Sequence, residues 1–146
     1  MKRDYPDRPI VGVGAVIVRG GRAVIVRRGG EPLAGEWSVP GGVLELGETL
    51  RQGAEREALE ETGLHVRAGE VLEVFDSIVP DASGRTQYHY VLVDFLCEYV
   101  SGELRAGGDA ADARWIDSAD LSQLSLRPSI EAVLRKGFEV SRQSRR

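Results

Sequence analysis

The chain has 146 residues, of which 42% are hydrophobic and 29% are charged, so it is long enough for one domain with one core and too short for two ordinary domains. This composition is globular and excludes wholesale disorder. The formal net charge of −4 argues against a general nucleic-acid binder, and we expect no nucleic acid as partner. No N-terminal segment resembles a signal peptide and no apolar run is long enough to span a bilayer, so we expect a cytoplasmic protein with no membrane partner.

The N-terminal part of the chain predicts an arm followed by a hairpin. Residues 1–8 are polar and are expected to form the arm. Apolar runs at 10–18 and 22–28 flank a glycine turn, which is typical of two paired strands. Gly12 and Gly14 are not followed by the third glycine and helix start of a dinucleotide-binding fingerprint. They therefore belong to a strand against which another group packs closely.

A Gly- and Pro-rich loop at 29–42 leads to the first predicted helix. Thr49 and Gln52, three residues apart, match the capping-box pattern that begins a helix. Gly63 is typical of the residue that ends one. We therefore expect a short helix between Thr49 and Gly63.

Strands dominate the second half of the sequence. The elements expected there are strands at about 65–76 and 86–99, a short strand entering a turn within 113–121, and a final helix at about 127–137. We predict an α+β domain over residues 9–138, with helices covering a sheet, and a flexible basic tail at 139–146.

The predicted first helix has an unusual crowding of carboxylates. Glu57, Glu60 and Glu61 fall within an arc of roughly 100° on one face. Like charges one turn apart destabilise a helix by about 0.2–0.5 kcal/mol per pair, and acids in the last turn also oppose the helix dipole. Arg56 can serve only one of them. Oxygen ligands on a rigid element suit Mg²⁺, so the pattern favours a divalent-metal site.

The complete spacing of this segment resembles the box of the Nudix hydrolase family. The matching positions, in the pattern G-x5-E-x7-R-E-x2-E-E-x-G, are Gly42, Glu48, Arg56, Glu57, Glu60, Glu61 and Gly63. A chance match is on the order of 10⁻⁹ per window at average residue usage. The resemblance covers roughly residues 9–137. It implies an α/β/α sandwich around a mixed sheet with a catalytic helix, and Mg²⁺- or Mn²⁺-dependent cleavage of a nucleoside diphosphate linked to another group.

The resemblance also implies roles for individual residues. It makes Glu57, Glu60 and Glu61 the metal ligands, with the carbonyl of Gly42 as an addition. Glu48 and Arg56 would pair to fix the loop against the helix, a structural task that Gly63 shares as the helix stop. The general base is left open between Glu60 and Asp109, which lies in a later loop together with Asp112.

The substrate is less constrained by the sequence. Pro80 lies 16 residues beyond Leu64, a spacing that resembles the ADP-ribose pyrophosphatase branch, although a turn at 80–85 would use Pro, Asp and Gly in any case. Arg85 from the same stretch and Trp37 are candidates for binding ribose and base, Trp37 being equally suited to the core. Arg27 and Arg28 point to opposite faces of their strand, so one of them is expected to face the phosphates, and Arg27 is taken as the substrate-binding candidate.

We therefore expect a small-molecule partner, a nucleoside diphosphate derivative. ADP-ribose, cleaved to AMP and ribose 5-phosphate, is the first expectation. A house-cleaning nucleoside triphosphate pyrophosphohydrolase of the MutT type shares every catalytic residue, and a non-catalytic nucleotide-ligand sensor on the same fold is the alternative from another class. A homodimer is left open, with Tyr5 of the arm reaching the site of a partner subunit.

Overall fold

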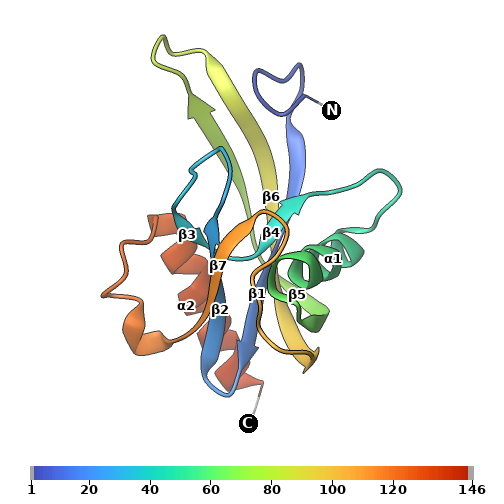
Figure 1. Cartoon of the computed structure of the whole chain (residues 1–146), viewed down its shortest axis with the longest axis vertical. Helices are drawn as coiled ribbons and strands as arrows, with labels where there is room; N and C mark the ends of the chain where they lie inside the picture. Colours follow the sequence, from blue (N-terminus) through green and yellow to red (C-terminus); the bar gives the residue numbers. More distant parts are fainter. Residues whose placement is uncertain (1, 145–146) are drawn as a thin grey trace.

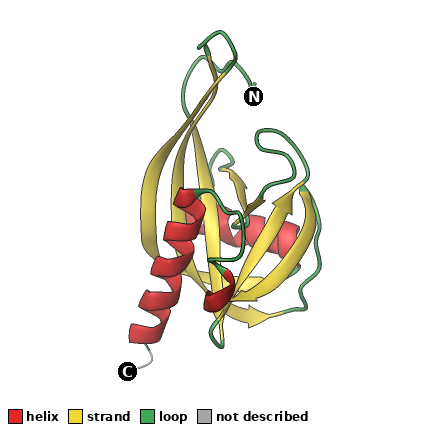
Figure 2. Cartoon of the chain, turned by 90° about the vertical axis from the view of Figure 1, so that its left-hand side faces the viewer, coloured by secondary structure: helices red, strands yellow, loops and turns green. Residues whose placement is uncertain are grey.

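The computed structural model describes residues 2–144, which form a mixed seven-stranded sheet with an α-helix on each face (Figure 1, Figure 2). The strands are β1 (Ile10–Arg19), β2 (Arg22–Arg28), β3 (Trp37–Ser38), β4 (Gly41–Val43), β5 (His65–Pro80), β6 (Thr86–Ser101) and β7 (Ala110–Asp117). The helices are α1 (Leu50–Thr62) and α2 (Pro128–Gln143), with a 3-10 helix at Ser118–Asp120. The predicted α+β class and the sandwich around a mixed sheet are confirmed.

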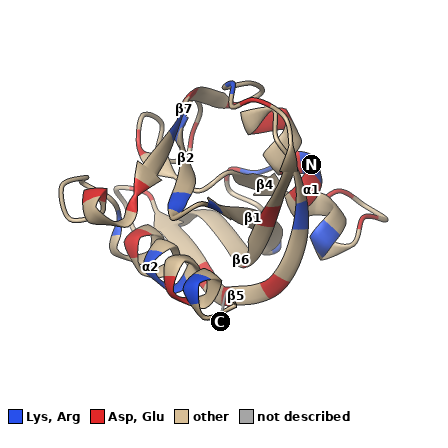
Figure 3. Ribbon diagram, turned by 90° about the horizontal axis from the view of Figure 1, so that it is seen from below, with Lys and Arg blue, Asp and Glu red and all other residues tan. Residues whose placement is uncertain are grey.

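Each face of the sheet carries its own apolar core. The strand order is β3-β2-β1-β6-β5, with β4 added to β1 and β7 added to β2, and β1 runs parallel to β6. Because successive strand residues point to opposite faces, the apolar strands supply both cores. Ala54 and Ala58 of α1 pack into one core, and Leu134 and Phe138 of α2 pack into the other. Figure 3 shows acidic and basic residues interspersed along α2, where Glu131 pairs with Arg135.

The hairpin strands β1 and β2 pair near their shared turn and then separate. Their pairing covers Val18 with Ala23 and Arg19 with Arg22. Farther from the turn, β1 pairs with β4 and β2 pairs with β3, while β7 pairs with β2 along its whole length, from Arg22 to Arg28. The cavity described below is lined by these separated parts of β1 and β2.

The ends of α1 agree with the sequence prediction. The Thr49 hydroxyl accepts from the Gln52 N–H at 3.1 Å and the Gln52 side chain accepts from the Thr49 N–H at 2.9 Å, which completes the capping box. Gly63 ends the helix with φ of 73°. These two ends fix which turns of the helix carry the acidic residues.

Several boundaries differ from the prediction. The loop at 29–42 contains the short strand β3 and the start of β4, because β2 and β1 offer them free edges. The helix α2 continues to Gln143 instead of ending near 137, since its apolar stripe runs on through the buried Phe138. Residues 139–143, which we assigned to a flexible tail, are therefore helical, and residues 145–146 lie outside the described part of the chain.

The N-terminal arm lies against the tip of the β5–β6 hairpin of its own chain (Figure 1). The Tyr5 hydroxyl donates to Asp81 at 2.7 Å and its backbone N–H donates to the Gln87 carbonyl at 2.7 Å. Tyr5 is thus engaged within the chain, and its predicted reach into a partner subunit stays a prediction. No helix among residues 2–144 has the length and apolar character needed to cross a membrane.

Candidate active site

The acidic residues of α1 divide between a buried and an exposed position. Glu57 and Glu61, one turn apart, are 9% and 7% exposed, whereas Glu60 points to the solvent side. Glu61 accepts a hydrogen bond from the Gly41 N–H at 2.8 Å, which ties the helix to β4. Two buried glutamates are therefore held at the edge of the sheet.

Gly42 allows β4 to approach the Glu57 carboxylate. A Cβ atom at this position would lie 2.5 Å from Oε1 of Glu57, closer than any side chain tolerates. The absence of a side chain therefore brings the carboxylate against the backbone of β4. The two groups that the sequence predicted to share a metal, the Gly42 backbone and Glu57, lie side by side.

Arg56 connects the loop before α1 with the acidic face. Its guanidinium donates to both oxygens of Glu48, with Nε to Oε2 at 2.7 Å and Nη2 to Oε1 at 3.0 Å. It also donates to Glu57 at 2.7 Å and to the Val43 carbonyl at 3.0 Å. The hydrogen bond from Arg56 keeps the pKa of Glu48 below its ordinary value. The implied pairing of Glu48 with Arg56 is thus present, and it supports the loop.

The buried carboxylates have perturbed acidities. Burial raises the pKa of Glu61 to about 7, against the Gly41 hydrogen bond that lowers it, and the charges of Glu57 and Asp109 raise it further. Burial also raises the pKa of Glu57, and Arg56 opposes that rise. Crowded, partly desolvated acids of this kind mark functional sites and accommodate a cation well.

The oxygen donors fit a hard divalent cation, although they are not gathered around one point. Within residues 2–144, no group of three His, Cys, Asp or Glu side chains forms a ready-made ligand shell. Glu57 and Glu60 instead share Arg56, whose Nη1 is 2.7 Å from one and 3.3 Å from the other. Four acids lie at this site, which are Glu57, Glu60, Glu61 and Asp109. The excess of carboxylate over guanidinium is what a divalent cation would neutralise.

Asp109 reaches the acidic group from the loop before β7. It lines the cavity, and its charge raises the pKa of both Glu57 and Glu61. Its backbone carbonyl accepts from the Gly29 N–H at 2.9 Å, which anchors the loop beside β2. Asp112, which the sequence placed in the same loop, lies in β7, where it accepts from the N–H of Ala113 and is 3.7 Å from Arg114. Of these two aspartates, Asp109 is the one beside the glutamates.

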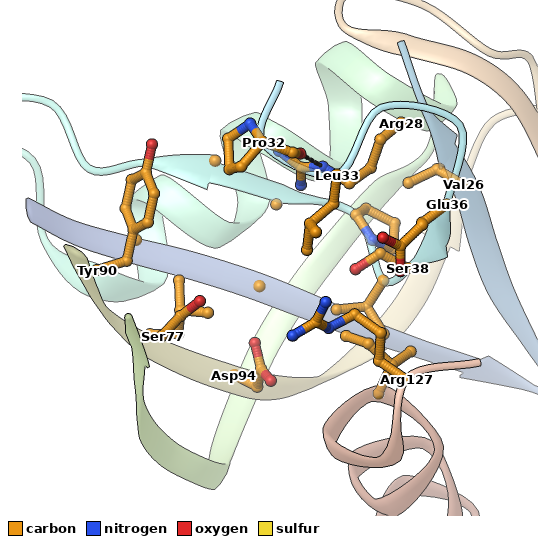
Figure 4. A pocket seen from close by; sticks show the side chains of 18 of the residues that line it. Val26, Arg28, Pro32, Leu33, Glu36, Ser38, Ser77, Tyr90, Asp94 and Arg127 are labelled. Carbon is orange, nitrogen blue, oxygen red and sulfur yellow. Dashed lines mark hydrogen bonds between the residues drawn. The ribbon is translucent and has the colours of Figure 1, made fainter. Parts of the chain in front are cut away.

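A cavity of about 430 Å³ opens next to these acids (Figure 4). Glu61, Gly42 and Asp109 are among the residues that line it. Its walls also carry apolar and aromatic side chains, among them Val26, Leu33, Trp37, Val39, Phe75, Tyr90, Leu92 and Ile130. Volumes between about 300 and 1,000 Å³ are usual for small-molecule sites. The cavity thus combines acids that suit a cation with phosphate and apolar walls that suit a ring.

The predicted substrate residues are divided by the structure. Trp37 lines the cavity, whereas Arg27, Pro80 and Arg85 lie outside its described lining. Arg28, from the opposite face of β2, lines it instead. Arg27 stands over the Trp37 ring at 6.0 Å, on the α2 side of the sheet. The register of β2 thus turns Arg28, and not Arg27, toward the cavity, and substrate binding by Arg27 stays a prediction.

Pro80 and Arg85 belong to the tip of the β5–β6 hairpin. Pro80 is the last residue of β5 and pairs with Thr86, and the Arg85 guanidinium stacks over the Tyr5 ring at 4.9 Å. Asp81 accepts from the N–H groups of Ser83 and Arg85, which closes the turn. The alternative that residues 80–85 simply form a turn thus accounts for their contacts. Neither Pro80 nor Arg85 lines the cavity, so the cavity gives no support for a contact between them and a substrate bound in the same chain.

Several cavity residues were not singled out individually from the sequence, and Tyr90, Asp94 and Arg127 are three of them. Tyr90 and Asp94 come from β6, and Arg127 comes from the residue before α2. Asp94 carried a visible signal, since it is a lone acid in the apolar run YVLVDFLCEYV and is only 3% exposed. Tyr90 and Arg127 carried none, because only the tertiary fold brings their elements to the cavity.

Comparison with known proteins agrees with this geometry. Residues 8–137 match the family model described as NUDIX domain. An ADP-ribose pyrophosphatase of Methanocaldococcus jannaschii is 34% identical over 117 residues, which are 80% of this chain and 67% of that protein. A putative 8-oxo-dGTP diphosphatase 2 of Mycobacterium tuberculosis is 35% identical over 120 residues, 80% of this chain and 79% of that protein.

Solved structures include a close match in fold. The crystal structure of the MutT NUDIX hydrolase from Burkholderia pseudomallei superposes with a TM-score of 0.72 at 31% identity. The match covers 89% of this chain and 98% of that one. The fold, a mixed sheet with two helices, is therefore shared over most of the chain.

Proposed function

Because this chain belongs to the Nudix hydrolases, enzymes that cleave pyrophosphate bonds, we propose that it hydrolyses ADP-ribose to AMP and ribose 5-phosphate. The observation that carries the proposal is the continuity of the acidic group with an aromatic cavity of about 430 Å³. A pyrophosphate at Glu61 and Gly42 would leave the cavity for the adenosine. The resemblance to an ADP-ribose pyrophosphatase at 34% identity points to the same substrate.

Members of this family generally act with divalent metal ions such as Mg²⁺. Here Glu57, Glu60 and Glu61 would hold the ion, with the Gly42 carbonyl as an additional ligand. Glu60 is the exposed member, so its carboxylate is free to turn from Arg56 toward the ion. A divalent ion supplies charge neutralisation for the pyrophosphate and activation of the attacking water.

The remaining groups position the substrate and take the proton. Arg28 lines the cavity and lowers the pKa of Glu61 through its charge, so its guanidinium is suited to a phosphate oxygen beside the acids. Glu60 or Asp109 accepts the proton of the attacking water. The water adds to the phosphorus atom on the adenosine side as the bond from that atom to the bridging oxygen breaks. AMP forms there, and ribose 5-phosphate leaves with the bridging oxygen.

The test is AMP release from ADP-ribose in the presence of Mg²⁺. Glu60→Gln is expected to keep the fold and to lower turnover by at least about 100-fold, because it removes a charged ligand from the reaction centre. Glu139→Gln, an exposed residue of α2, is the matched control and is expected to match the unmodified enzyme. Full activity of Glu60→Gln would contradict the metal assignment, and absence of AMP with the unmodified chain would contradict the substrate.

The second candidate is a house-cleaning nucleoside triphosphate pyrophosphohydrolase. The putative 8-oxo-dGTP diphosphatase that is 35% identical favours it, and the same acidic residues would serve. The parallel assay measures pyrophosphate release from dGTP and 8-oxo-dGTP. Release from these nucleotides at a higher kcat/KM than from ADP-ribose would select this function over the first.

A further inference from the structure

Leu33 has a backbone conformation that leucine rarely adopts. It lies in the loop between β2 and β3, and its φ of 64° falls in the left-handed region that favours glycine. The neighbouring turn does not require this conformation. The N–H of Glu36 donates to the Leu33 carbonyl at 3.2 Å, and Gly35, with φ of 85°, already fills the left-handed position of that turn. Backbone strain of this kind persists where the surrounding structure fixes it, and it is concentrated at functional sites.

Hydrogen bonds on both sides of Leu33 fix the loop. The Arg28 N–H donates to the Glu36 carbonyl at 2.9 Å, and the Gly35 N–H donates to the Arg28 carbonyl at 2.7 Å. The Arg28 guanidinium donates through Nε to the carbonyl of Pro32, the residue before Leu33, at 2.7 Å. The strained backbone of Leu33 is thus determined by the bonds of its neighbours, and it sets the direction of the side chain.

Packing in a core does not offset this strain. Leu33 is only partly buried, and it belongs to neither of the two apolar cores formed by the described residues. Its side chain lines the cavity instead, and Figure 4 shows it directed into that space. Glycine would adopt the same backbone conformation without penalty. A leucine at this position is therefore explained by a contact made inside the cavity.

The sheet supplies a second apolar wall that also lies outside both cores. Phe75 of β5 and Tyr90 and Leu92 of β6 line the cavity, and none of them belongs to the cores of residues 2–144. Phe75 pairs with Leu92, and two residues farther along Ser77 pairs with Tyr90, so these side chains lie on one face of the sheet. Figure 4 shows Ser77 and Tyr90 across the cavity from Leu33. The loop and the sheet thus enclose a space between two apolar surfaces.

A planar ring is the occupant that suits this space. Stacking on aromatic side chains and contact with apolar groups involve the faces of a ring, which every nucleobase presents. The same cavity is lined by Glu61 and Gly42, where the pyrophosphate of the proposed reaction would bind. The ring is therefore expected to belong to the nucleoside that is joined to this pyrophosphate.

We propose that Leu33 closes over the nucleobase of the substrate and holds the ring against Phe75 and Tyr90. The inference deepens the proposed function and rests on it for the position of the pyrophosphate. It makes Leu33 a substrate-positioning residue that acts through its side chain, while the left-handed backbone directs that side chain at the ring. The contact is with the ring faces, so it does not depend on which purine is bound.

The test measures the binding of AMP, GMP and ribose 5-phosphate by calorimetry in the presence of Mg²⁺. None of the three has a pyrophosphate bond to be cleaved, and ribose 5-phosphate lacks the base. Leu33→Ala is expected to weaken about tenfold the binding of each mononucleotide that the unmodified enzyme binds, and to leave ribose 5-phosphate unchanged. Leu33→Met, which keeps a long apolar side chain, is expected to retain the binding. Leu46→Ala, an exposed loop leucine outside the cavity lining, is the matched control and is expected to match the unmodified enzyme.

Leu33→Gly separates the side chain from the backbone. It is expected to unfold at a higher temperature than Leu33→Ala, because glycine adopts the left-handed conformation without strain. It is nevertheless expected to bind the mononucleotides no better than Leu33→Ala does. If Leu33 served the fold alone, affinity would instead follow stability and recover in Leu33→Gly.

Four results would overturn the inference. These are an unchanged mononucleotide affinity in Leu33→Ala, an equal loss for ribose 5-phosphate, a recovery of affinity in Leu33→Gly, and no mononucleotide binding in the unmodified enzyme. Circular dichroism establishes that each variant is folded, and Leu33→Gly decides the matter if Leu33→Ala is not. Leu33-dependent mononucleotide binding without AMP release from ADP-ribose would reject the proposed function and keep the inference. AMP release together with mononucleotide binding that is independent of Leu33 would do the opposite.

Discussion

At the scale of single residues, Asp94 is a cavity residue whose buried carboxyl group lowers the stability of the fold when it is ionised. Its pKa is raised from 3.8 to about 7 in the folded chain, mainly by burial. Folding therefore favours the protonated form, and the stability associated with it is complete below about pH 4 and is lost as the pH rises through 7. A carboxyl group needed only for folding would be replaced by an apolar residue at no loss.

This linkage predicts the behaviour of Asp94→Asn. The free energy of unfolding of the variant, relative to that of the unmodified chain, is expected to increase from pH 5 to pH 8, by no more than about 4 kcal/mol. The increase arises because only the unmodified chain must bury a charge at high pH. Urea unfolding at four pH values in EDTA measures it. If the difference in free energy of unfolding between the two chains stays constant over this range, the pKa of Asp94 is not raised by folding.

At the scale of elements, two sets of interactions stabilise α1, and each has a different function. The capping box at Thr49 stabilises the start of the helix, and the ion pair between Glu48 and Arg56 connects the preceding loop to the acidic face. Arg56 also touches Glu57, so the ion pair positions a group of the site. The cap lies at the opposite end of the helix from Glu60 and Glu61.

Variants of these two devices are expected to separate stability from activity. Glu48→Gln should lower the free energy of unfolding by about 1–3 kcal/mol and reduce kcat, because a half-buried guanidinium loses its charged partner and Glu57 loses its support. Thr49→Ala should cost about 1 kcal/mol and leave kcat unchanged. Thermal unfolding and steady-state kinetics on the same preparations make the comparison. Loss of activity in Glu48→Gln with undiminished stability would assign Glu48 to the reaction itself.

The sequence predicted the elements whose evidence is local. The spacing of Glu57, Glu60 and Glu61, together with the caps, identified α1 and its acidic face, since helix periodicity alone places those side chains. The pattern of β2 showed that one of Arg27 and Arg28 faces the site, but the choice depends on its register with β3 and β7. Arg127 joins the cavity through the packing of α2, which no local pattern encodes.

At the scale of the whole molecule, the fold concentrates negative charge at the junction of α1, β4 and the loop before β7. The pKa of Glu61 is about 7 rather than 4.5, first because of its burial. Glu61 and Asp94 both have raised pKa values in the folded chain, so folding favours their protonated forms. The free energy of unfolding of the metal-free protein therefore decreases as the pH rises from about 5 to 8. A bound cation would reverse this trend, since it requires ionised ligands.

Mg²⁺ is therefore expected to stabilise the protein more at pH 8 than at pH 5. At a concentration of 100 times Kd, a ligand of the folded state adds about 2.7 kcal/mol, which corresponds to a rise in Tm of roughly 5–10 °C for a chain of this size. At pH 5 the rise should be much smaller, because Glu61 must first release its proton. Differential scanning fluorimetry with EDTA or Mg²⁺ at both pH values measures the shift. Glu61→Gln should abolish most of the shift at pH 8, whereas Glu139→Gln should retain it. Equal shifts at the two pH values, or an unchanged shift in Glu61→Gln, would place the metal at other residues.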